Sequence, residues 1–112
     1  MKVEIKKELA ERDPLAALAK AATPVLEEAI GPPAARVTAI WGFQSDEYGR
    51  PIIQLTIKDS SGQADTKFAP EDLKPAEKAR RQFYWLWGEL LQKASQRLTQ
   101  ELETVGADEQ GS

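Results

Sequence analysis

Hydrophobic residues in the first third of the chain recur at helical spacing. Asp13-Pro14 is a typical helix start, in which a capping side chain precedes a proline at the first helical position. Gly31-Pro32-Pro33 ends the pattern. Pro24 lies inside it, so we expect a helix with a kink, or a cap and a restart, at that residue. The apolar positions of this helix are Leu15, Leu18, Ala22, Leu26, Ala29 and Ile30.

The period of the pattern changes to two after Arg36, which indicates β-strands. Residues 37–44 and 51–58 both alternate, and residues 63–68 give a weaker third strand. The segments between them have turn composition, so the three strands should form an antiparallel meander whose second face is mostly polar and solvated. The side chains expected on the inner face are Val37, Ala39, Trp41, Phe43, Ile53, Leu55 and Ile57.

The longest amphipathic pattern runs from residue 76 to about Val105 and predicts a long helix. A helix over 76–104 would be about 43 Å long, whereas a seven-residue strand covers only about 23 Å, so the helix should overhang its sheet. Either the N-terminal segment or a second copy of the chain should cover the overhang. The apolar arc consists of Phe83, Leu86, Trp87, Leu90, Leu91, Ala94, Leu98, Leu102 and Val105, with Tyr84 at its edge.

The two ends of the chain are less clearly patterned. Residues 2–12 begin with a strand-like alternation, but their Glu, Lys, Leu and Ala content favours a helix, which we prefer. Residues 106–112 are small, polar and acidic, and we expect a disordered tail. The resulting prediction is one two-layer α+β domain over residues 1–105. Its order is helix, three antiparallel strands and long helix, with both helices on one face of the sheet.

The amino-acid composition excludes most of the common catalytic and metal-binding side chains. The chain has 112 residues, no histidine and no cysteine, so it lacks an imidazole base, a thiolate and the usual ligands of zinc, haem and iron–sulfur clusters. Its glycines do not form a phosphate-binding motif. We therefore expect no cofactor and no metal. Adjacent acids such as Glu27-Glu28 and Glu71-Asp72 are typical of solvated turns and helix starts, and a small carboxylate-dependent enzyme is our third hypothesis.

The first residues carry charges where a secretory signal requires an apolar stretch. No apolar run approaches the roughly 18 residues of a membrane span. We therefore expect a cytoplasmic protein without a membrane partner.

Trp85 is the first candidate for partner binding, because on a helical wheel it lies nearly opposite the centre of the apolar arc. It either packs on the first helix or the N-terminal segment, or remains exposed as an anchor for a partner, since tryptophan is enriched in interface hot spots. Gly88 lies near the margin of the arc and is a candidate for close helix approach. Together with Leu98 and Leu102, these residues favour a non-catalytic interaction domain that forms a homodimer, or binds another protein, through the long helix.

Charge is distributed unevenly although the net charge is only −3. A basic cluster, which we define as Lys74, Lys78, Arg80 and Arg81, opens the long helix, where positive charge opposes the helix dipole. This cluster either pairs with nearby acids or contacts phosphate. Residues 73–82 carry +3 (the cluster against Glu77), and residues 59–72 carry −3 (Lys67 against Asp59, Asp65, Glu71 and Asp72).

With the basic cluster on its second helix, the order of elements over residues 14–95 resembles the layout of double-stranded RNA-binding domains. In that family, basic residues at the start of the second helix hold phosphates, and the first helix lies in the minor groove. The resemblance is one of architecture. It implies nucleic-acid contact through Lys74, Lys78, Arg80 and Arg81, which is our alternative hypothesis.

Overall fold

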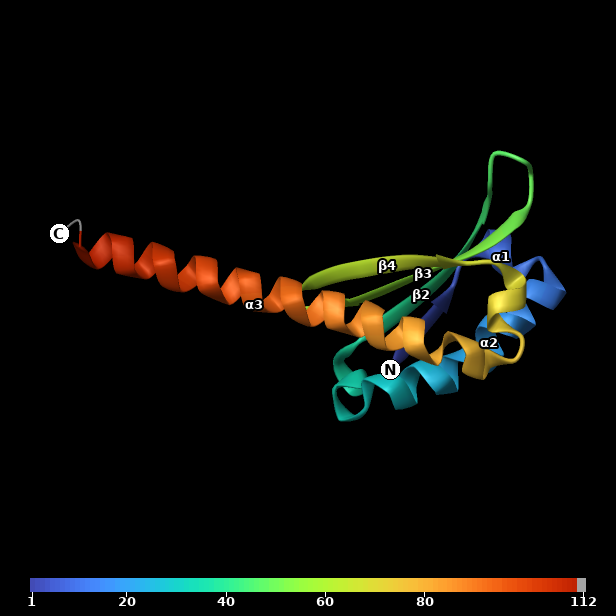
Figure 1. Ribbon diagram of the computed structural model, residues 1–112, viewed down its shortest axis with the longest axis horizontal. Helices are drawn as coiled ribbons and strands as arrows, with labels where there is room; N and C mark the ends of the chain where they lie inside the picture. Colours follow the sequence, from blue (N-terminus) through green and yellow to red (C-terminus); the bar gives the residue numbers. More distant parts are fainter. Residues whose placement is uncertain (111–112) are drawn as a thin grey trace.

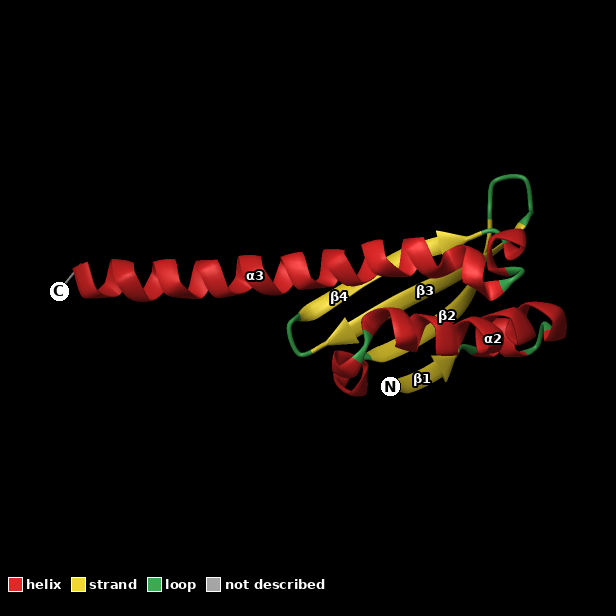
Figure 2. Ribbon diagram, turned by 60° about the horizontal axis from the view of Figure 1, so that its bottom comes forward, coloured by secondary structure: helices red, strands yellow, loops and turns green. Residues whose placement is uncertain are grey.

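A computed structural model describes residues 1–110, with side chains as far as Gln96. Four strands form one sheet in the order β1-β2-β3-β4, and the helices α2 and α3 cross the same face of it (Figures 1 and 2). The predicted two-layer α+β fold is thus confirmed. The elements in chain order are β1 (Lys2–Ile5), α1 (Lys7–Ala10), α2 (Asp13–Ile30), β2 (Thr38–Ser45), β3 (Pro51–Asp59), β4 (Gly62–Phe68) and α3 (Arg80–Gln110), with 3₁₀ turns at Pro32–Arg36, Pro70–Leu73 and Ala76–Ala79.

The meander has the predicted register of inner and outer faces. Trp41 pairs with Leu55, and Leu55 in turn pairs with Thr66, both in antiparallel ladders. Alternate side chains therefore point at the helices and are buried, whereas Phe43, near the end of β2, is only partly covered. The buried side chains of the three strands are Ala39, Trp41, Ile53, Leu55, Ile57, Ala64 and Phe68.

The N-terminal segment corrects the prediction of a helix over residues 2–12. Its first part forms β1, which adds a fourth strand parallel to β2, and only Lys7–Ala10 form a helical turn. The free edge of β2 is a pairing partner that local composition does not reveal, and alternation turns Val3 and Ile5 to the helix side. Leu9 is fully buried in the core. This segment is held by β2 and α2, at the opposite edge of the sheet from β4. The side chains of the overhang that it was expected to cover lie outside the described residues.

Helix α2 passes through Pro24 as one element rather than ending and restarting there. Ala22, Val25 and Leu26, on both sides of the proline, are buried. Tertiary packing therefore holds the helix across a residue that would interrupt it in isolation. Next to the proline, the Thr23 hydroxyl donates to the Ala19 carbonyl at 2.9 Å.

Three aromatic rings fix α3 on the sheet. The ring centre of Phe83 lies 6.4 Å from that of Trp41 and 5.6 Å from that of Phe68, in edge-on geometry. Leu86 and Leu90 continue this buried side of the helix. Beyond them, α3 extends far past the ends of the strands, as the sequence predicts (Figure 1).

Both ends of α3 differ from the expected ones. The helix begins at Arg80, because Ala76–Ala79 form a 3₁₀ turn after Pro75. It continues to Gln110, so residues 106–110, expected in a disordered tail, are helical. No proline follows Pro75. Gly106, where the tail was expected to begin, costs a helix only about 1 kcal/mol, which is too little to end α3 there. Residues 111–112 of the expected tail, and the side chains of Leu98 and Leu102, lie outside what the structure describes. Among the described helices, none is long and apolar enough to cross a membrane.

Candidate functional site

Large apolar side chains are exposed on α3 outside its buried side. Trp85 is 68% exposed, and Tyr84 and Leu91 are each 50% exposed. Trp85 therefore packs neither on α2 nor on the N-terminal segment, which was one of the two possibilities left by the sequence. Its exposure is unusual for so large an aromatic residue within an ordered helix.

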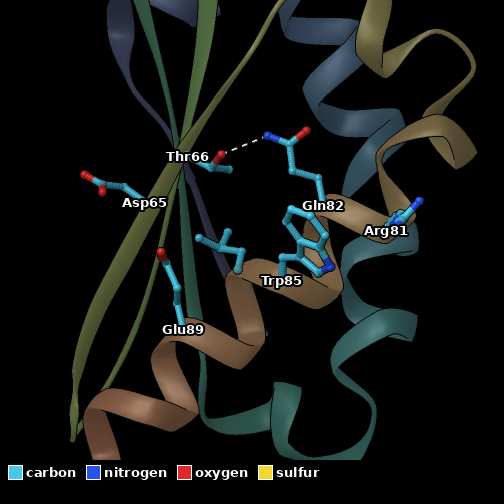
Figure 3. Close-up of a pocket in the computed structure, with 7 residues that line it drawn as sticks. Asp65, Thr66, Arg81, Gln82, Trp85 and Glu89 are labelled. Carbon is cyan, nitrogen blue, oxygen red and sulfur yellow. Dashed lines mark hydrogen bonds between the residues drawn. The ribbon is translucent and has the colours of Figure 1, made fainter.

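A groove of about 640 Å³ lies next to Trp85, between α3 and β4 (Figure 3). Along the helix, Trp85 lies between Arg81 and Glu89, one turn away on either side, and Asp65 projects from the strand (Figure 3). The guanidinium carbon of Arg81 lies 5.6 Å from the centre of the Trp85 ring, within range of a cation–π contact. The lining residues are Asp65, Thr66, Arg81, Gln82, Trp85, Leu86 and Glu89.

Strand β4 is an edge strand, and α3 caps part of its free edge. Gln82 Nε2 donates to the Thr66 hydroxyl at 2.8 Å and to the Lys67 carbonyl at 3.2 Å, and Lys93 Nζ donates to the Gln63 carbonyl at 2.7 Å. Backbone groups alternate in direction along a strand, so Asp65, between these two residues, also turns its N–H and C=O outward. Within the described residues, no hydrogen bond outside the ladder reaches these two groups of Asp65. The middle of the edge is therefore open.

The structure separates the residues of the basic cluster. Arg80 binds both carboxylate oxygens of Glu77, at 2.8 and 2.9 Å, and also lies 3.3 Å from a carboxylate oxygen of Glu28 on α2. The hydrogen bonds from Arg80 hold the pKa of Glu77 below its ordinary value. Hydrogen bonds with Glu77, Tyr84 and Glu28 raise the pKa of Arg80. Arg81 instead borders the groove, while Lys74 and Lys78 are exposed on the turns before α3.

Gly88 does not mark a close approach within the chain. A Cβ atom built at this residue would have no neighbour within 4 Å, and the residue is exposed. The side chains of Leu98 and Leu102 lie outside what the structure describes. Of the residues predicted to contact a partner or nucleic acid, the groove brings together Trp85 and Arg81.

Sequence reasoning missed the polar residues of the groove and of the adjoining β4 edge. Gln82, Glu89 and Lys93 lie on one side of α3, separated by seven and four residues. This spacing is a signal that could have identified a polar side meeting the sheet edge. Asp65 and Thr66 could not be found in this way, because the register of β4 depends on its pairing with β3.

The groove is lined by both charged and apolar side chains. In the described side chains, no ionisable residue is buried, and no three potential metal ligands lie together. What the groove presents is an aromatic surface, charges of both signs, and an open pair of backbone hydrogen-bonding groups. Comparisons of the chain with protein-family models, curated proteins and solved structures found no match.

Proposed function

We propose that this chain is a non-catalytic interaction domain that associates with a second copy of itself through α3. The exposure of Trp85 carries the proposal. The other side of the same helix places Phe83, Leu86 and Leu90 in the core, so Trp85 is not needed to hold α3 on the sheet. Burial of an exposed tryptophan at an interface removes a large apolar area from water, which favours association.

Two further features favour a second copy as the partner. The chain has a net charge of only −3, so two copies repel each other weakly. In addition, α3 has 31 residues and is about 46 Å long at 1.5 Å per residue, and its exposed side chains include Tyr84 and Leu91. A long helix with apolar groups on its free sides is suited to pairing with another helix.

The test is the molar mass in solution, measured by light scattering or sedimentation from about 1 to 200 µM, a range that covers weak to moderate affinities. We expect a dimer, and we expect Trp85→Ala to raise its dissociation constant about tenfold or more, the size of a hot-spot effect. Tyr48→Ala is the matched control, because Tyr48 is 75% exposed in the turn between β2 and β3, away from α3. A monomer across the whole range would contradict the proposal.

Nucleic-acid binding, the alternative, has less support from the geometry. It requires the four residues of the basic cluster to act on one polyanion. Arg80 is engaged by Glu77 and Glu28, and Arg81 lines the groove beside Trp85 on α3, whereas Lys74 and Lys78 lie on the turns before the helix.

A further inference from the structure

We propose that two copies of the chain join their β4 strands in antiparallel pairing about a two-fold axis. The two sheets would become one continuous sheet, and the two Trp85 side chains would lie next to each other beside the axis. This inference rests on the proposed self-association and identifies the surface that carries it.

The open middle of the β4 edge provides the backbone groups. If Asp65 stands opposite Lys67 of the second copy, each residue donates its N–H to the other's carbonyl, and symmetry repeats this pair on the other side of the axis. The axis then passes beside Thr66. The Lys67 carbonyl already accepts from Gln82, but at the long distance of 3.2 Å. A carbonyl oxygen has two lone pairs and can accept a second hydrogen bond.

Charge selects this register from the alternatives. Asp65 and Lys67 are both exposed and lie on the same face of β4, two residues apart. In the proposed register each faces the opposite charge on the other strand, which is favourable. An axis beside Asp65 would place two aspartates directly opposite each other, and an axis beside Lys67 would do the same with two lysines. Both registers are unfavourable, because like charges directly opposite each other destabilise paired strands.

The charges on α3 are complementary about the same axis. Thr66 and Trp85 line the same groove, so an axis beside Thr66 also passes near Trp85. Two α3 helices related by it run antiparallel, and Arg81 and Glu89 are equally spaced on either side of Trp85. Arg81 of one copy therefore meets Glu89 of the other, twice. Two independent charge pairs thus agree on one two-fold interface, which is the property of a surface that recognises itself.

The arrangement also has room for both helices. Strands in a sheet are about 4.8 Å apart, whereas packed helix axes need about 8 to 10 Å. Because α3 packs on β3 as well as β4, its axis is set back from the free edge of β4. This displacement occurs in both copies and increases the distance between the two α3 axes. The opposite edge is less suited, since β1 has only four residues and carries an ion pair between Lys2 and Glu4 at 3.9 Å.

Charge exchange between the copies tests the interface. Arg81→Glu places acids at both positions 81 and 89, and Glu89→Arg places arginines at both. In a homodimer of either variant, residue 81 of one copy therefore faces a like charge at position 89 of the other, in both symmetric contacts. We expect the dissociation constant of each homodimer to rise about tenfold or more. An equimolar mixture of the two variants should form a heterodimer with an affinity within about threefold of the unaltered dimer, because every contact is again between opposite charges. Native mass spectrometry distinguishes the heterodimer by mass.

Asp65→Pro tests the strand pairing separately. It removes an N–H that points outward, so the ladder to β3 keeps its hydrogen bonds, and proline is tolerated on an edge strand. We expect this variant to remain folded by circular dichroism and to be monomeric.

If the charge variants and Asp65→Pro still form dimers but Leu91→Glu does not, self-association through α3 stands and this surface is wrong. A monomeric unaltered chain would overturn both proposals. Failure of the mixed variants to recover affinity would overturn the two-fold geometry.

Discussion

Two tryptophans of this chain lie in regions with opposite properties. Trp41 is fully buried between Phe68 and Phe83, and its indole N–H donates to the Thr23 hydroxyl at 3.1 Å. Trp85 is 68% exposed at the edge of a groove, next to a guanidinium group. The two residues belong to the same domain and have the same chemistry. Their surroundings therefore assign them different roles.

The comparison shows how one helix serves both regions. Phe83 and Trp85 are two residues apart on α3, which turns them about 200° from each other around the helix axis. One contributes to the aromatic core and the other borders the groove. Changes in the core should therefore alter the stability of a single chain, whereas changes at the groove should alter association and leave the fold intact.

The largest expected effect is on stability and comes from Phe83→Ala. Truncation of a fully buried phenylalanine removes two aromatic contacts and leaves a cavity, so we expect a loss of about 3 to 5 kcal/mol in the free energy of unfolding. Trp85→Ala, compared at concentrations where both variants are monomeric, should change it by no more than about 0.5 kcal/mol. Urea unfolding followed by circular dichroism measures both values. Equal losses of unfolding free energy in Phe83→Ala and Trp85→Ala would contradict the distinction between the core and the groove.

A smaller effect is expected from the polar contact of the core. Thr23→Val keeps the shape of the side chain but removes the acceptor of the Trp41 indole N–H, which is buried. An unsatisfied buried donor costs about 1 to 3 kcal/mol, and we expect a loss of this size in urea unfolding. Thr23→Ser is the matched control, because it retains the hydroxyl. If the valine and serine variants are equally stable, the hydrogen bond does not contribute to holding Trp41.

The sequence predicts the core region better than the groove. Alternation within β2 and β3, and the helical spacing of Phe83, Leu86 and Leu90, are local signals of the side that is buried. They are enough to place Trp41 inside, whereas they leave open whether Trp85 packs within the chain or stays exposed. Each depends only on the geometry of its own element, which is why the two-layer α+β fold follows from the pattern.

The parts that the sequence did not predict depend on contacts between distant segments. The pairing of β1 with β2 joins residues about 36 positions apart, as in Lys2 with Thr38. Arg80 contacts Glu28 across 52 positions, which removes it from the basic cluster proposed for nucleic acid. The open edge at Asp65 likewise depends on which strand ends the sheet. Such features need the tertiary arrangement, because several partners are compatible with the same local pattern.

The smallest expected effect lies where α3 begins, at the ion pair between Glu77 and Arg80, outside both tryptophan regions. The pKa of Glu77 is lowered from an ordinary value of 4.5, so the folded state favours the ionised carboxylate. Its contribution to stability is present above pH 4.5 and is lost as the pH falls through the lower pKa of the folded state.

Glu77→Gln should therefore have a slightly lower unfolding temperature than the unaltered chain at pH 7. The difference should shrink below pH 4.5. Because the pair is exposed, added salt should reduce the difference as well. A difference that stays constant from pH 7 to acid would mean that the glutamine variant acts through packing rather than charge.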